Sequence, residues 1–143
     1  MQISRTIHIC VESNHKMNFH NYMSIKSFYV HDVSIVLWVD GEIEGEYAEK
    51  VKSLVGIKRL DGDDMIGVCL KYGGVMVKFG TLCLNSIDVF RNIPLGIYVK
   101  NDKIIALVSY KDNYMYTRLV DICRVGKSIT KACMYMDDTN IGV

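Results

Sequence analysis

The feature that most constrains this chain is an unbroken run of apolar residues, Ile104 to Val108, in its last third. A strand with one wet face alternates apolar and polar residues, whereas an uninterrupted run predicts a strand that is covered on both faces. The polar stretch Lys100–Lys103 just before it predicts a tight turn and a hairpin with Ile97–Val99. We therefore expect residues 104–110 to form a central strand of a sheet.

A second regular pattern follows between Tyr116 and Cys133. Its apolar residues fall three or four apart in their main steps, which is typical of one stripe of an amphipathic helix; they are Leu119, Ile122, Cys123, Ile129 and Cys133. Such a helix can bury its stripe only against a sheet, so we expect a terminal helix docked on the strand before it.

Composition limits the broad class of protein. With 143 residues and 16.3 kDa the chain is most simply one domain. A formal net charge of +1 gives no basic field for nucleic acid, which argues against a nucleic-acid binder. The longest apolar runs are far shorter than the roughly 20 residues of a membrane span.

The five cysteines indicate a reducing compartment. They show no C-x-x-C spacing of the kind used by zinc or redox sites, and they are Cys10, Cys69, Cys83, Cys123 and Cys133. The sequence also has no Asn-x-Ser/Thr acceptor and no signal peptide at its start. We expect reduced thiols and a cytoplasmic protein.

The remaining segments predict an α+β domain. Residues 1–16 are expected to be an N-terminal extension, for which disorder is the default. Helices are expected at 18–23 and 46–55, and strands at 25–29, 33–39, 66–71, 75–77, 81–84 and 87–91. With the hairpin this gives a central antiparallel sheet of six to seven strands covered by helices.

Two local patterns suggest chemistry but are better explained as turns or strand residues. His31-Asp32 are neighbours that a strand would point to opposite faces, and the chain has no nucleophile elbow. Asp61-Gly62-Asp63-Asp64 begins like a calcium loop, but apolar Met65 and Ile66 follow and no Glu closes it. We therefore expect no enzyme activity, no metal and no cofactor.

Several stretches together resemble profilin, the small actin-monomer-binding family. The last third carries the resemblance best, since Val99–Asp112 is similar to the family's "VKKT-x-x-ALVIGIYDEP" segment. Weaker similarities lie in Arg124–Ile129, Gly74–Val77, Gly80–Leu82, Val89–Arg91, Met17–Tyr22 and Ser34–Trp38. The resemblance implies a domain over residues 17–135 with a tail at 136–143. It also implies N- and C-terminal helices on one face of the sheet and a short helix on the other.

The resemblance further implies a cytoskeleton-associated monomer that regulates actin. Profilins bind proline-rich segments in an aromatic groove, and the matching residues are Phe19, Tyr22, Trp38 and Tyr135. The positions matching the actin face are Thr81, Cys83, Arg91, Tyr116, Arg118, Asp121 and Arg124. Phosphoinositide lipids would meet Arg124, Lys127 and Lys131.

Plainer interpretations stay open beside this one. Phe19, Tyr22 and Trp38 are equally what a hydrophobic core contains. Arg118, Asp121 and Arg124 at three-residue steps are typical of any solvated helix face. A different class of protein, an α+β scaffold of the longin or roadblock type that dimerises in trafficking or signalling complexes, also places helices on an antiparallel sheet.

Overall fold

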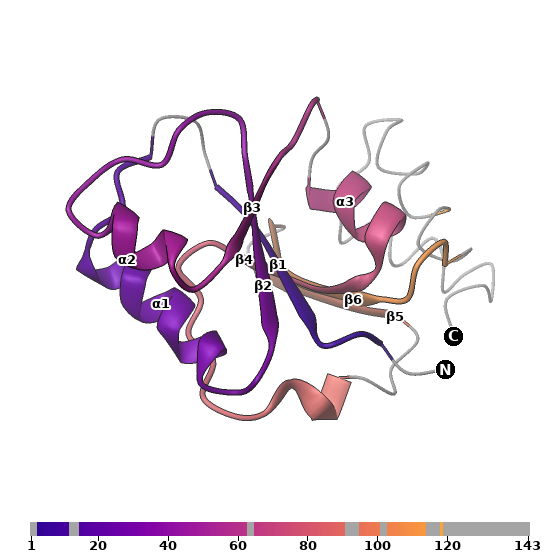
Figure 1. The fold of residues 1–143 in the computed structure, drawn as a ribbon. Helices are drawn as coiled ribbons and strands as arrows, with labels where there is room; N and C mark the ends of the chain where they lie inside the picture. The colour runs from indigo at the N-terminus through magenta and orange to yellow at the C-terminus, as the bar shows by residue number, and fades with distance from the viewer. Residues whose placement is uncertain are drawn as a thin grey trace.

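A computed structural model of the chain describes residues 3–11, 15–62, 65–90, 95–100, 103–113 and 118. Within these ranges the chain forms an α+β domain built on one mixed sheet of six strands (Figure 1). The spatial order of the strands is β3-β2-β1-β4-β6-β5. Their bounds are β1 Thr6–Cys10, β2 Ser34–Val39, β3 Gly56–Arg59, β4 Gly74–Lys78, β5 Leu95–Lys100 and β6 Lys103–Ser109.

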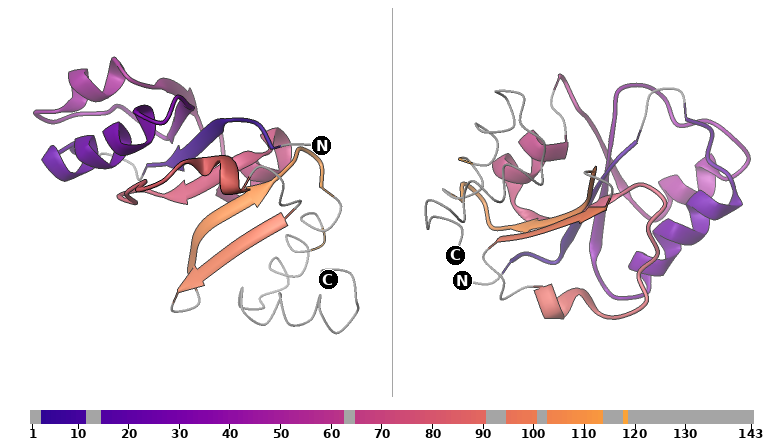
Figure 2. Two further views of the ribbon diagram at one scale, coloured as in Figure 1. Left: turned by 90° about the horizontal axis from the view of Figure 1, so that it is seen from below. Right: turned by 180° about the vertical axis from the view of Figure 1, so that it is seen from behind.

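The sheet has a parallel part and an antiparallel part. Strand β1 pairs in parallel with β2 on one side and with β4 on the other, and β3 continues the parallel part beyond β2. Strand β6 then runs antiparallel to β4, and the β5–β6 hairpin completes the sheet (Figure 2). Strands β2 and β4 are apolar for most of their length, as strands covered on both faces are, whereas β3 at the edge of the sheet is exposed throughout.

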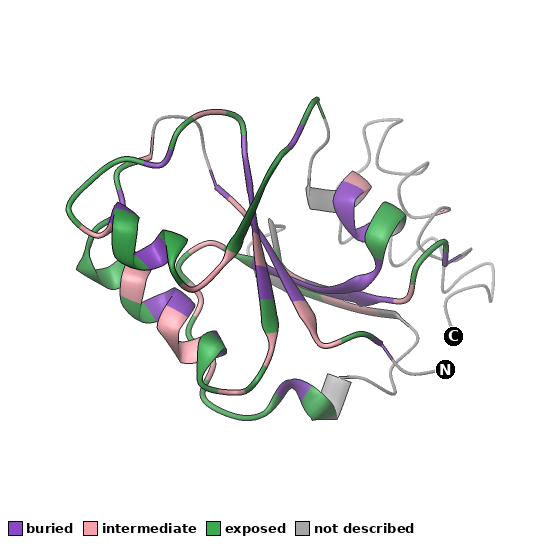
Figure 3. Cartoon of the chain, in the orientation of Figure 1, coloured by how far each residue is buried: buried purple, intermediate pink, exposed green. Residues whose placement is uncertain are grey.

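Helices cover both faces of the parallel part. Helices α1 (Phe19–Tyr29) and α2 (Ala48–Lys52) lie on one face, and α3 (Met65–Tyr72) lies on the other (Figure 1). Two hydrophobic clusters fill these layers: Ile7, Leu37 and Val75 belong to the α1 side, and Trp38, Met76 and Leu107 to the α3 side. Figure 3 shows the central strands largely buried between the layers, and β3 and the outer helix faces exposed.

The expected antiparallel sheet is therefore wrong for β1, β2 and β3, which pair only in parallel, and for one side of β4, which is parallel to β1 but antiparallel to β6. The expectation that residues 1–16 form an extension also differs from the structure. Thr6–Cys10 is the strand between β2 and β4, and Ile7 and Ile9 are fully buried. Five consecutive residues suffice for a buried strand, so its brevity hid it in the sequence.

Two expected strands are helices. Residues 25–29 continue helix α1, whose buried stripe includes the polar residues Asn21 and Ser24 beside Ile25 and Phe28. Those polar members mask the helical period in the sequence. Residues 66–71 lie in α3, because a short apolar run does not distinguish a buried helix from a strand.

Other expectations hold or fall outside the described residues. The hairpin of β5 and β6, strand β2, strand β4 and the core of the helix at 46–55 are confirmed. The expected strand at 81–84 has no regular structure, and Ile87–Phe90 is a short 3-10 helix, η1. The expected terminal helix lies outside the described residues except for Arg118.

Two further findings concern the expected compartment. In the described part of the chain, no helix is long and apolar enough to cross a membrane. The three described cysteines, Cys10, Cys69 and Cys83, are free thiols.

Candidate functional site

The topology singles out one edge of the sheet. Strand β1 connects to β2 on one side, whereas its other neighbour, β4, comes later in the chain, so the strand order reverses between β1 and β4. In open sheets with parallel strands, ligands bind outside the carboxyl ends of the strands at such a switch point. We call the carboxyl ends of β1–β4, with the loops that leave them, the carboxyl edge.

The segment just before α1 contacts the end of β4. The His15 ring meets the Phe79 ring edge-on, with 4.8 Å between their centroids. His15 Nε2 donates a 3.0 Å hydrogen bond to Oδ1 of Asn21 in α1. One histidine thus links the end of β4 to the start of α1.

The start of α1 lies at this same edge and carries a reciprocal cap. The side chain of Asn18 accepts from the Asn21 backbone N–H at 3.0 Å, and the Asn21 side chain accepts from the Asn18 N–H at 3.0 Å. The first turn contains no acidic residue, so its positive dipole end is not neutralised from within the helix. Such an end favours an anion.

Basic side chains flank the switch point. Lys78, the last residue of β4, is exposed, and so is Lys16 next to His15. Neither amine forms a salt bridge with a described residue. By contrast Arg59, at the end of β3, is held by Glu42 at 3.8 Å and by the carbonyl oxygen of Asp40 at 3.5 Å. The unpaired positive charge of the carboxyl edge is therefore concentrated beside β1 and β4.

Next to β2 the edge contains an acidic group and a small recess. Asp40 directly follows β2 and is exposed. A recess of about 180 Å³ lies between the ends of β2 and β3, lined among others by Gly41, Glu42, Lys52 and Arg59. The edge thus offers cations at the switch point and a carboxylate one strand away.

Behind the edge, on the α3 face, a buried histidine joins two strands. His8 Nδ1 accepts a 3.0 Å hydrogen bond from the Trp38 indole, and its Nε2 donates to the Gly73 carbonyl oxygen at 2.9 Å. Burial lowers the pKa of His8 to about 4, an effect that the Gly73 bond partly opposes and the positive charge of Lys58 reinforces. His8 is therefore neutral at pH 7 and acts as a fixed link in the scaffold.

The glycines next to this link are required by their geometry. Gly73 and Gly74 have φ values of +69° and +102°. A Cβ on Gly74 would lie 2.9 Å from the Thr6 carbonyl oxygen, and a Cβ on Gly73 would lie 2.5 Å from the Lys111 nitrogen. This local geometry brings the Gly73 carbonyl oxygen to His8.

The residues expected to form a proline-binding groove are separated. Phe19 and Tyr22 lie on α1, where Tyr22 stacks on Tyr47 with centroids 5.5 Å apart. Trp38 is only 4% exposed and belongs to the cluster on the opposite face of the sheet. The expectation that one groove joins Phe19, Tyr22 and Trp38 is wrong, because neighbouring residues of β2 point to opposite faces and Trp38 points away from α1. Tyr135 lies outside the described residues.

The residues expected to contact actin are mostly beyond the described ranges. Thr81 and Cys83 are half-buried in the segment that follows β4, where they bond to α1. Arg118 is half-buried. The other expected actin and phosphoinositide positions lie outside the described residues, namely Arg91, Tyr116, Asp121, Arg124, Lys127 and Lys131.

Sequence reasoning missed the residues of the carboxyl edge. His15, Lys16, Asn18, Lys78 and Phe79 are unremarkable singly, and only the parallel pairing of β1 with β4 brings them together. A signal was present in the alternation of short apolar strands with helical segments, which is typical of parallel sheets. Among the described residues, no three His, Cys, Asp or Glu side chains gather as a metal site would require.

Comparisons with known proteins show the fold and leave the family open. No family model matches the sequence, and no curated protein matches it. Among solved structures, one described as PaToxG Glycosyltransferase is similar with a TM-score of 0.62 and 12% sequence identity. The similarity covers 92% of this chain and 64% of that one, so the chain spans less than two thirds of its structural neighbour.

Proposed function

We propose that this chain binds a sugar linked to a nucleoside diphosphate, with the diphosphate at the switch point of the carboxyl edge. The observation that carries the proposal is that β4 ends at Lys78 and α1 begins after β1, so both lie at the carboxyl edge next to the β1–β4 reversal. Positive side chains and the positive dipole end of a helix start are complementary to phosphate oxygens. Lys16 adds a second amine from the loop that His15 holds in place.

A ribose fits the neighbouring strand end. In sheets of this type a carboxylate after the second strand accepts hydrogen bonds from ribose hydroxyls. Asp40 has this position, directly after β2, and its exposed carboxylate forms no salt bridge with a described residue. The phosphates and the nucleoside would then extend along the carboxyl edge from β4 towards β2.

The structural neighbour supports the sugar component. A glycosyltransferase, as that protein is described, moves a glycosyl group, and a nucleoside diphosphate is a phosphate leaving group for such a transfer. The actin and polyproline expectations find no comparable support in the described residues, because Trp38 lies on the opposite face of the sheet from Phe19 and Tyr22.

The test is calorimetric titration of the full chain with uridine diphosphate and, separately, with inorganic pyrophosphate, each with and without EDTA. Lys78→Glu should weaken both ligands at least tenfold, because a charge-assisted hydrogen bond of about 1.5–3 kcal/mol is replaced by repulsion. Asp40→Asn should weaken uridine diphosphate but leave pyrophosphate unchanged. Lys111→Glu is the matched control, because Lys111 is exposed beyond β6 at the opposite edge of the sheet.

The outcomes separate the parts of the proposal. Equal losses for Lys78→Glu and Lys111→Glu would mean that only overall charge matters, and would contradict the switch-point site. If the chain bound uridine diphosphate and pyrophosphate with equal affinity, the nucleoside part of the proposal would be overturned. No binding of either ligand would overturn the proposal as a whole.

A further inference from the structure

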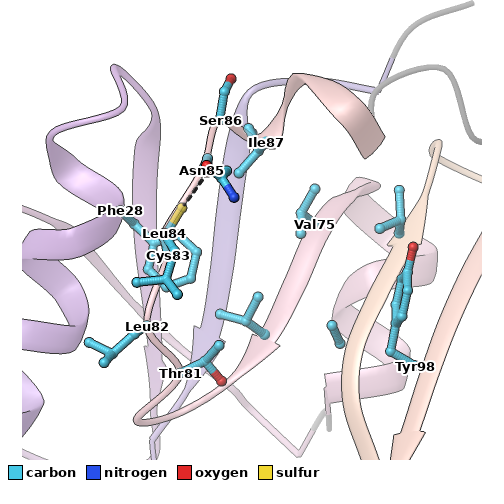
Figure 4. A pocket seen from close by; sticks show the side chains of 13 residues that line it. Phe28, Val75, Thr81, Leu82, Cys83, Leu84, Asn85, Ser86, Ile87 and Tyr98 are labelled. Atoms are coloured by element: carbon cyan, nitrogen blue, oxygen red, sulfur yellow. Dashed lines mark hydrogen bonds between the residues drawn. The ribbon is translucent and has the colours of Figure 1, made fainter.

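A second hollow lies on the α1 face of the sheet, under the segment that leaves β4 (Figure 4). Residues 79–90, which we call the strap, follow β4 and cross this face beside α1. Between the strap and strands β4, β6 and β5 is a pocket of about 360 Å³. Its floor is the sheet face of Val75, Val77, Ala106 and Val108, and Tyr98 of β5 forms one wall.

The strap is fastened at three points, which keeps it from collapsing onto the sheet. Ser24 Oγ donates a 2.5 Å hydrogen bond to the Thr81 carbonyl oxygen, and Ser27 Oγ accepts one of 2.8 Å from the Cys83 backbone N–H. At its far end Asp88 forms a salt bridge with Arg5, which also donates to the His31 carbonyl oxygen at 2.9 Å. The hollow is therefore built into the fold, as ligand pockets usually are.

The lining determines which ligand fits. Apolar side chains make up the floor and the mouth, where Leu82 and Leu84 are 58% and 82% exposed. The strap contributes the polar side chains of Thr81, Asn85 and Ser86, and Tyr98 adds a hydroxyl on the β5 wall. An apolar cavity of about 150 Å³ holds one benzene ring, so this pocket has room for a group about twice that size. Its volume is also within the range of small-molecule sites.

We propose that this pocket binds a hydrocarbon group of roughly ten carbon atoms, a fused ring pair or a medium-length chain, with its polar end directed to Asn85 and Ser86. The proposal does not rest on nucleotide binding, because the pocket residues lie on the face covered by α1 and the proposed phosphate site lies at the strand ends. Loss of one should leave the other intact.

The test is a fluorescence titration of the full chain with N-phenyl-1-naphthylamine, followed by displacement with straight-chain alcohols of six to sixteen carbons. Saturable binding of one probe per chain is expected, with the strongest displacement near ten carbons. Ala106→Phe fills the floor and should reduce probe affinity at least tenfold. Ile105→Phe is the matched control, since residue 105 points to the other face of the same strand and is 36% exposed.

A second variant guards against a folding defect in Ala106→Phe. Leu84→Asp changes an exposed side chain at the mouth, so the fold should survive while affinity falls at least fivefold. Probe binding that is absent, or unaffected by both variants, would overturn the proposal. So would light scattering that shows a dimer which Leu84→Asp dissociates, because the hollow would then be an interface between two copies of the chain.

Discussion

The Trp38 indole N–H donates a hydrogen bond to Nδ1 of His8 across two neighbouring strands at a distance of 3.0 Å. The same imidazole donates from Nε2 to the Gly73 carbonyl oxygen, so both ring nitrogens are used and the tautomer is fixed. The arrangement requires a neutral ring, because a protonated Nδ1 would face the indole N–H donor. His8 thereby makes the scaffold behind the carboxyl edge sensitive to acid.

Stability should fall between pH 6.5 and pH 4. The folded state holds the pKa of His8 at about 4, below the usual 6.5, so the unfolded chain binds this proton more readily. The neutral His8 ring contributes about 3 kcal/mol to the free energy of unfolding. This contribution is complete above pH 6.5 and is lost as the pH falls to about 4. Urea denaturation of the wild type and of His8→Gln at several pH values measures it. Identical pH dependence of the two proteins would contradict this role of His8.

Trp38→Ala should lower the free energy of unfolding by about 3–5 kcal/mol, because a buried indole and its hydrogen bond are both lost. Tyr29→Ala is a suitable control: Tyr29 is 46% exposed on α1, and the change should stay within about 1 kcal/mol. Chemical denaturation followed by circular dichroism compares the two. A negligible loss for Trp38→Ala would place the indole on the surface, as the expected proline-binding groove required.

The cap of α1 should behave as a coupled pair. Asn18→Ala and Asn21→Ala each remove one of two reciprocal hydrogen bonds and should each cost about 1 kcal/mol, with a further loss at Asn21 because His15 also bonds to it. The double variant should cost less than the sum of the single variants. Strict additivity in this double-mutant cycle would show that the two bonds form independently.

Local hydrophobic pattern predicted the elements that are apolar throughout or that have a simple period. The β5–β6 hairpin, β2 and the core of α2 are examples. The direction of strand pairing was not predictable from such patterns. The alternation of Ile7 and Ile9 with polar residues is compatible with parallel and with antiparallel neighbouring strands. Helix α1 was predicted only in its first turn and a half because Asn21 and Ser24 occupy its buried stripe.

The candidate site was less predictable than the fold for the same physical reason. Phe79 and His15 are 64 positions apart in the sequence, and their rings meet only because β4 pairs with β1. The profilin resemblance grouped several aromatic residues into one groove. The pleat of β2 separates them, because it turns Trp38 to the face of the sheet opposite α1. Sequence patterns indicate which residues are buried. They indicate less directly which of these residues lie on the same face of the sheet.

The strap should loosen when its bond to α1 is removed. Ser27→Ala leaves the Cys83 N–H without its acceptor, so amide hydrogen exchange at Cys83 should accelerate at least tenfold while exchange in β1 stays unchanged. Ser53→Ala, which removes a similar bond to the Lys50 carbonyl oxygen at the exposed end of α2, is the control and should leave the strap unaffected. Unchanged exchange at Cys83 would show that the strap is held by its other contacts.

The central claim is tested most directly by mapping backbone amide shifts in nuclear magnetic resonance spectra as uridine diphosphate is added to the full chain. The account predicts that the largest shifts fall at the carboxyl edge, at Lys16, Phe19, Asp40, Lys78 and Phe79, while Gly73 and Lys111 at the opposite edge stay unmoved. Shifts centred on the opposite edge, or none at saturating nucleotide, would contradict it.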